Sequence, residues 1–132
     1  IQAVLEARSD RVFGWLTEAV AAAGPEPADQ LTAAFDALQG WYDDPVFRGC
    51  AMINAATQHC DDAIRALTAR HLDRYLELLT GIAERAGAAN PTVLGRQWLI
   101  LVEGATVVAA HHDAASAGEY ACAAAIARSK AR

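Results

Sequence analysis

His71 and Tyr75 are the residues whose types and spacing best suit the binding of a small molecule. They lie one helical turn apart in the middle of an otherwise apolar helical face. A buried polar group without a hydrogen-bond partner costs about 1–3 kcal/mol, so both side chains need a partner. Either they bond each other or a neighbouring backbone carbonyl within the core, or they line an internal cavity and present hydrogen-bonding groups to a small ligand. The sequence leaves both alternatives open.

Asn54, Trp98 and Tyr42 raise the same two alternatives. Large aromatic side chains at helical spacing usually fill volume, which favours a core position for Trp98. Asn54 lies in the stretch PVFRGCAMINAA, at the margin of an apolar face. It contacts either a ligand or a backbone group, and the sequence does not favour one of the two.

Motifs that support catalysis are absent from the sequence. It contains no HExxH, no paired ExxH, no GxGxxG, no phosphate-binding loop and no GxSxG. His111, His112 and Asp113 are the nearest approach to a metal cluster, but adjacent helical residues point about 100° apart and chelate one ion poorly. Arg96 and Glu103 are expected to form a polar edge rather than a catalytic pair. We therefore expect no enzyme, no metal and no cofactor.

Composition narrows the remaining classes. The formal net charge of −5 disfavours direct binding of this chain to nucleic acid. The most apolar window, residues 98–110, is shorter than the ~20 residues of a membrane span and contains Glu103, so no membrane span is expected. Cys50, Cys60 and Cys122 are an odd number without CxxC spacing, which is typical of free thiols in a reducing compartment. We expect a cytoplasmic protein.

The elements that position these residues are all expected to be helices. The chain of 132 residues fits one domain, alanine is abundant, and glycine and proline fall mainly between periodic segments. The third helix opens at Pro45 after an Asp44 cap and contains Gly49 and Cys50 on its apolar side. Around it we expect helices at 2–23, 28–43, 62–86 and 91–112, and an alanine-rich sixth that begins at Ser116.

The fifth helix is apolar on most of its circumference and must therefore be buried on two sides. In a chain this small, a second copy most easily covers the second side. The sixth helix, rich in alanine, allows close backbone approach. Both helices together predict a two-fold homodimer through residues 91–131. The expected interface residues are Gln97, Ile100, Gly104, Val107, His111, Tyr120 and Ala124.

Three stretches suggest a family. FRGCAMINAA, NPTVLGRQWLILVEGATVVAA and the first segment, IQAVLEARSDRVFGWL, resemble the C-terminal ligand-binding and dimerisation domain of TetR/AcrR-type transcriptional regulators. The resemblance covers essentially the whole chain and implies a six-helix orthogonal bundle. It implies that residues 1–23 form the helix leading to a DNA-binding head. Because the sequence starts at Ile1 without a methionine, we expect that a helix-turn-helix precedes it in the complete protein.

The resemblance also implies a function. A small, largely apolar effector would enter a cavity among the middle helices, tilt the connecting helix and release a repressor dimer from operator DNA. The site would lie on the inward faces of the helices that contain Phe35, Tyr42, Cys50, Asn54, His71, Tyr75 and Trp98. The alternative is a stand-alone helical homodimer that binds other proteins and has a filled core.

Overall fold

Six α-helices make up the computed structural model, which describes residues 1–59 and 61–131, and no strand occurs in that part of the chain. The prediction of an all-α fold is therefore confirmed. Five helices begin and end within one residue of the positions expected from the sequence, where for the sixth helix only the start was predicted. The elements are α1 (Gln2–Ala22), α2 (Pro27–Tyr42), α3 (Ala51–Gln58), α4 (Asp62–Arg85), α5 (Pro91–His111) and α6 (Ala117–Ala131).

Local chemistry fixes several of the helix ends. Gly24, with φ of 89°, follows α1 in a backbone conformation that favours glycine. The Asp61 side chain accepts the Ala63 N–H at 2.8 Å at the start of α4. Asn90 caps α5 in the same way, and Pro91 occupies its first turn. The first backbone N–H groups of a helix have no acceptor within the helix, and the oxygen atoms of these side chains supply one.

The third helix starts six residues later than predicted, because Asp44 and Pro45 open a turn and not a helix. Asp44 Oδ1 accepts the N–H of Val46, two residues on, at 3.0 Å. Gly49 then adopts φ of 90°, which a right-handed helix cannot contain. The prediction that Gly49 and Cys50 lie within the helix is therefore wrong. Residues 43–50 form a linker, and Cys50 is only the cap residue of α3.

The linker is held by an aromatic anchor. Phe47 is buried, and its ring meets the Trp41 ring edge to face with 4.8 Å between centroids. Burial of this side chain ties the linker to α2 and places residues 44–50 beside α1.

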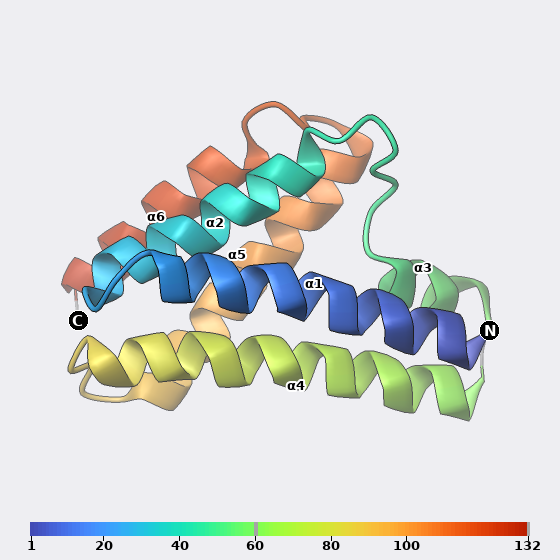
Figure 1. Ribbon diagram of the computed structural model, residues 1–132, viewed down its shortest axis with the longest axis horizontal. Helices are drawn as coiled ribbons and strands as arrows, with labels where there is room; N and C mark the ends of the chain where they lie inside the picture. The colour runs from blue at the N-terminus through green and yellow to red at the C-terminus, as the bar shows by residue number, and fades with distance from the viewer. Residues whose placement is uncertain (60, 132) are drawn as a thin grey trace.

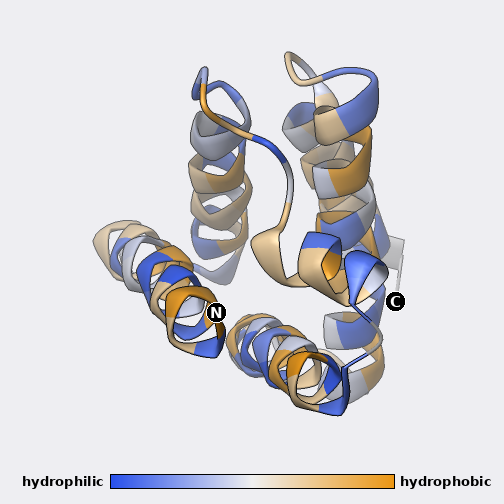
Figure 2. Cartoon of the chain, turned by 90° about the vertical axis from the view of Figure 1, so that its right-hand side faces the viewer, coloured by the Kyte–Doolittle hydropathy of each residue, from blue (hydrophilic) through white to orange (hydrophobic). Residues whose placement is uncertain are grey.

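The long helices α1 and α4 lie side by side, and α2 and α6 form a second pair (Figure 1). Helix α5 packs against both α4 and α6 and so joins the two pairs. Each helix carries hydrophobic and hydrophilic residues (Figure 2). The main core lies where the apolar sides meet, around the buried residues Phe35, Leu38, Leu79, Ile82, Trp98 and Val102.

Helix α5 approaches its neighbours closely at two points. A Cβ at Gly95 would overlap Thr80 Oγ1 and lie 3.2 Å from Thr80 Cα, so only glycine lets α4 and α5 touch there. Trp98 Nε1 donates a hydrogen bond to the Ala125 carbonyl at 3.1 Å, which ties α5 to α6. Among the described helices, α5 alone is long and apolar enough to cross a membrane. A helix buried in a protein core can have the same length and the same apolar composition.

Candidate ligand site beside helix α1

A cavity of about 670 Å³ lies between α1, α2, the 43–50 linker and the start of α3. One residue of α4, His71, also lines it. Its volume is in the range of sites for drug-sized molecules. Val12 and Trp15 of α1 and Ala37 and Trp41 of α2 give the cavity apolar walls, whereas Arg8, Arg11 and Arg48 give it charge, so it suits an occupant with one apolar and one polar end.

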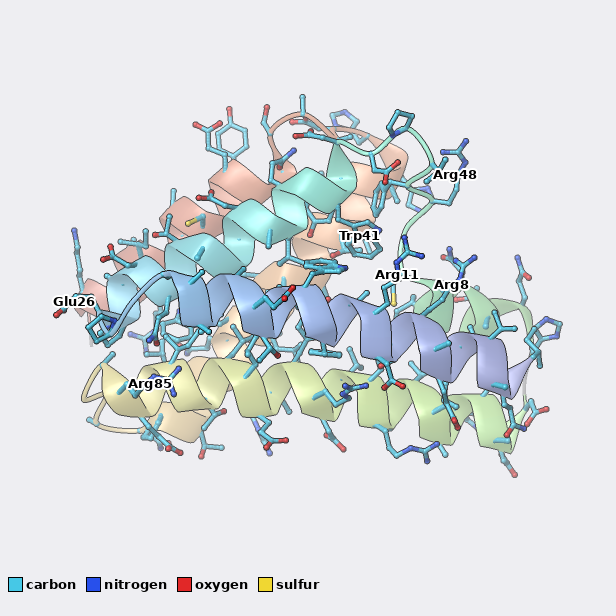
Figure 3. The ribbon with its side chains drawn as sticks, viewed as in Figure 1. Arg8, Arg11, Glu26, Trp41, Arg48 and Arg85 are labelled. Atoms are coloured by element: carbon cyan, nitrogen blue, oxygen red, sulfur yellow. The ribbon has the colours of Figure 1, made fainter. Side chains whose placement is uncertain are left out.

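Three aromatic side chains form much of the apolar wall. Trp15 and Trp41 are half-buried, with ring centroids 6.2 Å apart, and Phe47 contacts Trp41 from the linker. Figure 3 shows Trp41 above α1, toward the linker. Such rings offer flat surfaces against which a flat apolar body packs well.

Arginines stand at the mouth of the cavity. Arg8 and Arg11 come from one face of α1, since residues three apart are neighbours on a helix, and Arg48 comes from the linker (Figure 3). Arg48 Nη1 donates to the Pro45 and Phe47 carbonyls at 3.0 and 2.8 Å. Arg8 and Arg11 make no hydrogen bond or ion pair with any described residue.

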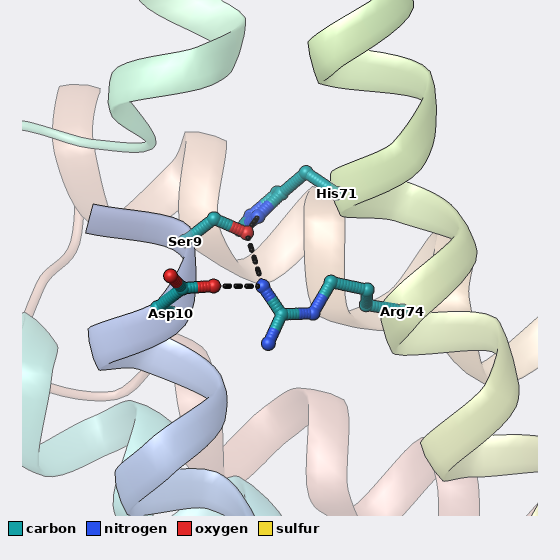
Figure 4. Close-up of polar contacts among 4 residues, drawn as sticks. All are labelled: Ser9, Asp10, His71 and Arg74. Carbon is teal, nitrogen blue, oxygen red and sulfur yellow. Dashed lines mark hydrogen bonds and ion pairs between the residues drawn. The ribbon is translucent and has the colours of Figure 1, made fainter. Parts of the chain in front are cut away.

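His71 joins the cavity to helix α1 through a polar cluster in which Ser9 and His71 are buried, Arg74 is half-buried and Asp10 is exposed (Figure 4). Its Nδ1 lies 2.8 Å from Ser9 Oγ, and Arg74 Nη1 donates to Ser9 Oγ at 3.1 Å and to Asp10 Oδ1 at 2.8 Å. Burial, with a smaller effect from the Arg74 charge, lowers the pKa of His71 to about 4. The imidazole is therefore neutral at pH 7. Ser9 Oγ accepts from Arg74, and among the described residues Nδ1 is the only acceptor within hydrogen-bond distance of its hydroxyl. We therefore assign the hydroxyl proton to the bond with Nδ1 and the imidazole proton to Nε2.

A second cavity of about 510 Å³ lies on the other side of this cluster, between α1 and α4. Ser9, Asp10, His71 and Arg74 line it together with the exposed residues Glu6, Arg70 and Asp73. Three of its lining residues are acidic and none is a tryptophan, tyrosine or phenylalanine, whereas three such rings and a single acidic residue line the aromatic cavity. We therefore take the aromatic cavity as the candidate ligand site.

Glu103 on α5 is the carboxyl group most affected by burial, which raises its pKa to about 7. Burial also raises the pKa of the Cys50 thiol and, strongly, that of Tyr75. A thiol with a raised pKa is a poor nucleophile at neutral pH. No group of three or more His, Cys, Asp or Glu side chains placed to hold a metal occurs in residues 1–59 and 61–131.

The predicted ligand residues fall into two groups. Cys50, Asn54 and His71 line the aromatic cavity. Asn54 is exposed, and its Nδ2 donates to the Arg48 carbonyl at 2.9 Å, so it already has a backbone partner. The other four residues are buried in the main core and do not line the cavity: Phe35, Tyr42, Tyr75 and Trp98.

The structure gives the hydrogen-bond partners of Tyr42 and His71, which the sequence left open. The Tyr42 hydroxyl bonds Thr106 Oγ1 at 2.8 Å, across the α2–α5 contact. His71 and Tyr75 meet edge to face with 5.3 Å between centroids, without a hydrogen bond between them. The partner of His71 is thus Ser9 on another helix, which was neither of the core partners considered from the sequence.

Sequence reasoning missed Arg8, Arg11, Trp15, Trp41 and Ser9. Ser9 had a detectable signal, because it lies on the apolar stripe of α1 between Leu5 and Phe13, all three buried. A small polar residue in such a stripe indicates a buried hydrogen bond. The arginines and tryptophans had no comparable signal, since their cavity depends on the course of the linker.

Six of the seven predicted dimer residues are exposed. Ile100 is 71% exposed, Val107 52% and Tyr120 72%. Gly104, His111 and Ala124 are exposed as well, and Gln97 is half-buried and accepts a hydrogen bond from Arg128 Nε at 2.8 Å. A Cβ at Gly104 would meet no atom within 4 Å. This strip of α5 and α6, residues 97–111 and 120–124, is called the α5–α6 face below.

Two kinds of sequence comparison find nothing, since no family model and no curated protein sequence matches the chain. The comparison of structures gives a clear result. The fold matches a TetR-family transcriptional regulator from Streptomyces coelicolor with a TM-score of 0.88 and 21% sequence identity. The match covers 96% of this chain and 63% of the regulator, so the chain spans less than two thirds of that protein's length.

This likeness confirms the predicted fold class, an all-α bundle of the TetR type. The matched protein is a transcriptional regulator. At 21% identity the likeness establishes the fold, and function must be argued from the site.

Proposed function

We propose that these 132 residues are the effector-binding and dimerisation part of a TetR-type transcriptional repressor, released from DNA by a small, largely apolar ligand. One observation carries the proposal: the aromatic cavity has helix α1 as a wall. In the TetR resemblance, α1 is the helix that leads to the DNA-binding head. An occupant of the cavity therefore touches the element that would carry its signal.

The contacts of α1 support such coupling. On one side α1 contributes Arg8, Val12 and Trp15 to the cavity, and on the other it is fastened to α4 through the Ser9–His71 and Asp10–Arg74 bonds. A ligand that favours one position of α1 against α4 shifts the spacing of the two heads in a dimer. Couplings of this kind are typically about 1–3 kcal/mol, or 5- to 150-fold in DNA affinity.

The α5–α6 face supports a homodimer. It exposes large apolar side chains next to a glycine and alanines, a surface that a second copy of the same face covers in an isologous two-fold contact. The two α5 and two α6 helices would then form a four-helix bundle. In such a dimer, residues outside these 132 would bind operator DNA, and the protein would act in the cytoplasm.

A thermal-shift screen of small apolar compounds tests the proposal. A ligand that binds only the folded chain raises its stability by RT ln(1 + [L]/Kd), which is about 2.7 kcal/mol at a ligand concentration of 100 times Kd. The matched control is Ala37→Trp, which places a large side chain into the cavity from α2. Compounds should raise the melting temperature of the wild type and not of the variant.

A release assay completes the test. A compound found in the screen should weaken binding of the complete protein to DNA upstream of its own gene in a mobility-shift titration. If no compound stabilises the wild type more than Ala37→Trp, the alternative of a protein-binding homodimer without a ligand site is favoured instead.

A further inference from the structure

The mouth of the aromatic cavity is positively charged, although the chain as a whole carries −5. Three of its eleven Lys and Arg residues, Arg8, Arg11 and Arg48, line this one cavity. Asp44 is the only acidic residue among the lining residues, and its Oδ1 is engaged by the Val46 N–H. Glu103 is not part of the lining. The local charge is thus opposite in sign to that of the protein.

Arg8 and Arg11 lack the partners that several other arginines have; among the described residues they share this with the exposed Arg70 and Arg96, which do not line the aromatic cavity. Arg74 pairs with Asp10, Arg85 Nε donates to Gln30 Oε1 at 2.9 Å, and Arg128 Nε donates to Gln97 Oε1. Arg8 and Arg11 have no such contact with the described residues. A guanidinium offers five N–H donors in a planar fork, and its best small partner is a carboxylate or similar acid group bound through two hydrogen bonds.

The inner end of the cavity offers a neutral donor. His71 is only 2% exposed and lines the cavity. Its Nδ1 is taken by Ser9, and the structure gives its Nε2 no hydrogen-bond partner. A neutral imidazole with its proton on Nε2 donates to a carbonyl or ether oxygen. Trp15, Trp41 and Phe47 line the same cavity as this donor and the arginines.

We propose that the effector is an organic anion with three parts: a carboxylate or similar acid group bound by Arg8 and Arg11, a flat apolar body against the aromatic wall, and a hydrogen-bond acceptor that reaches His71 Nε2. This inference rests on the proposed function and sharpens it, because it names the chemistry of the ligand. The negative charge of the ligand then lies against α1 and faces Arg48 of the linker. Binding of the anion removes the repulsion among the three arginines and draws α1 toward the linker.

Two dyes with a similar aromatic body test the role of charge. 1-Anilinonaphthalene-8-sulfonate carries one negative charge, whereas N-phenyl-1-naphthylamine is the same ring system without the sulfonate. Fluorescence titration gives a Kd for each. The anionic dye should bind the wild type at least tenfold more tightly than the neutral dye. In the Arg8→Gln, Arg11→Gln double variant its Kd should rise tenfold or more, while the Kd of the neutral dye changes less than twofold.

The matched control is the Arg65→Gln, Arg96→Gln double variant, which changes the net charge equally at exposed residues away from the cavity. It should leave both Kd values unchanged within twofold. Equal losses of anionic dye binding in the two double variants would overturn the proposal, because net charge alone would then explain the effect. Equal affinity of the wild type for the two dyes would overturn it as well.

Variants that fill the cavity separate failure of this inference from failure of the proposed function. Ala37→Trp, or Ala51→Trp if the first does not fold, should abolish binding of both dyes. If filling abolishes binding but the arginine variants do not alter it, the ligand cavity stands and the anionic ligand is wrong. If filled variants bind both dyes normally, the cavity is not the binding site and both proposals fail. If the wild type binds neither dye, the anionic-ligand inference fails and the compound screen decides on the proposed function.

Discussion

Ser9 on α1 and His71 on α4 form a buried hydrogen bond of 2.8 Å that joins two helices 62 residues apart in the chain. Arg74 extends the contact by donating to Ser9 Oγ, and its guanidinium lies over the Phe13 ring, 4.6 Å from the centroid. The bond fixes the register of α1 against α4 and also fixes the tautomer of His71. If His71 binds the ligand as we propose, stability and ligand recognition share one side chain.

Ser9→Ala should destabilise the chain by about 1–3 kcal/mol, because it leaves the buried Nδ1 of His71 without a partner. Urea denaturation followed by circular dichroism measures the change. Thr17→Ala, at an exposed position of the same helix, removes a hydroxyl without touching His71 and should cost less than about 0.5 kcal/mol. Equal costs for the two variants would show that the Ser9–His71 bond contributes nothing.

The lowered pKa of His71 predicts a loss of stability in acid. The unfolded chain takes up a proton near pH 6.5, while the folded chain does so only near pH 4. Between these values the unfolded state binds more protons. The free energy of unfolding therefore decreases as the pH is lowered, by up to about 3 kcal/mol. His71→Asn keeps an acceptor for Ser9 and does not titrate. The stability of the wild type relative to this variant should fall from pH 7 to pH 4, and a constant difference would contradict the burial of His71.

Glu103 acts in the opposite direction. Its carboxyl group ionises near pH 4.5 in the unfolded chain and near pH 7 in the folded chain, so the folded state binds more protons between these values and loses stability as the pH rises. Glu103→Gln should remove this loss and gain about 1–3 kcal/mol relative to the wild type between pH 4.5 and 7.5. Urea titrations of both proteins at the two pH values measure it. A gain that is equal at both values would mean that Glu103 is not desolvated.

The helices could be predicted from sequence because their signals are local. Gly24-Pro25, Asn90-Pro91 and the apolar stripes of 3.6-residue period each act within a few residues, and the structure follows them. Asp44-Pro45 carries the same local signal but forms a turn. The cause lies further away, because Phe47 inserts into the core against Trp41 and Gly49 adopts a left-handed conformation, which a helix from Pro45 would not allow.

The candidate site was less predictable for the same reason. Three of the predicted ligand residues, Cys50, Asn54 and His71, line the cavity, which lies beside α1 and the linker. That they bind a ligand stays a prediction. Trp98 and Tyr42 fill the core, where Ala125 and Thr106 satisfy their polar atoms. Those partners come from helices distant in the chain, and no spacing within one helix indicates them.

The α5–α6 face should mediate a dimer of the chain at micromolar concentration in sedimentation velocity. Ile100→Glu together with Val107→Glu places two charges on each copy of the face and should give a monomer with unchanged helix content, because both side chains are exposed in the single chain. Val4→Glu, at a 58% exposed position of α1, is the control and should remain dimeric. A wild-type monomer at these concentrations would remove the basis of the dimer proposal.

Hydrogen–deuterium exchange with and without a bound compound tests the central claim, that an occupant of the aromatic cavity acts on α1. We expect slower amide exchange in residues 8–15 of α1 and in residues 41–54, which form the opposite wall. The Ala37→Trp variant should show no such slowing at the same compound concentration. Slowing confined to the α5–α6 face, or exchange in residues 8–15 that the compound leaves unchanged, would contradict the account.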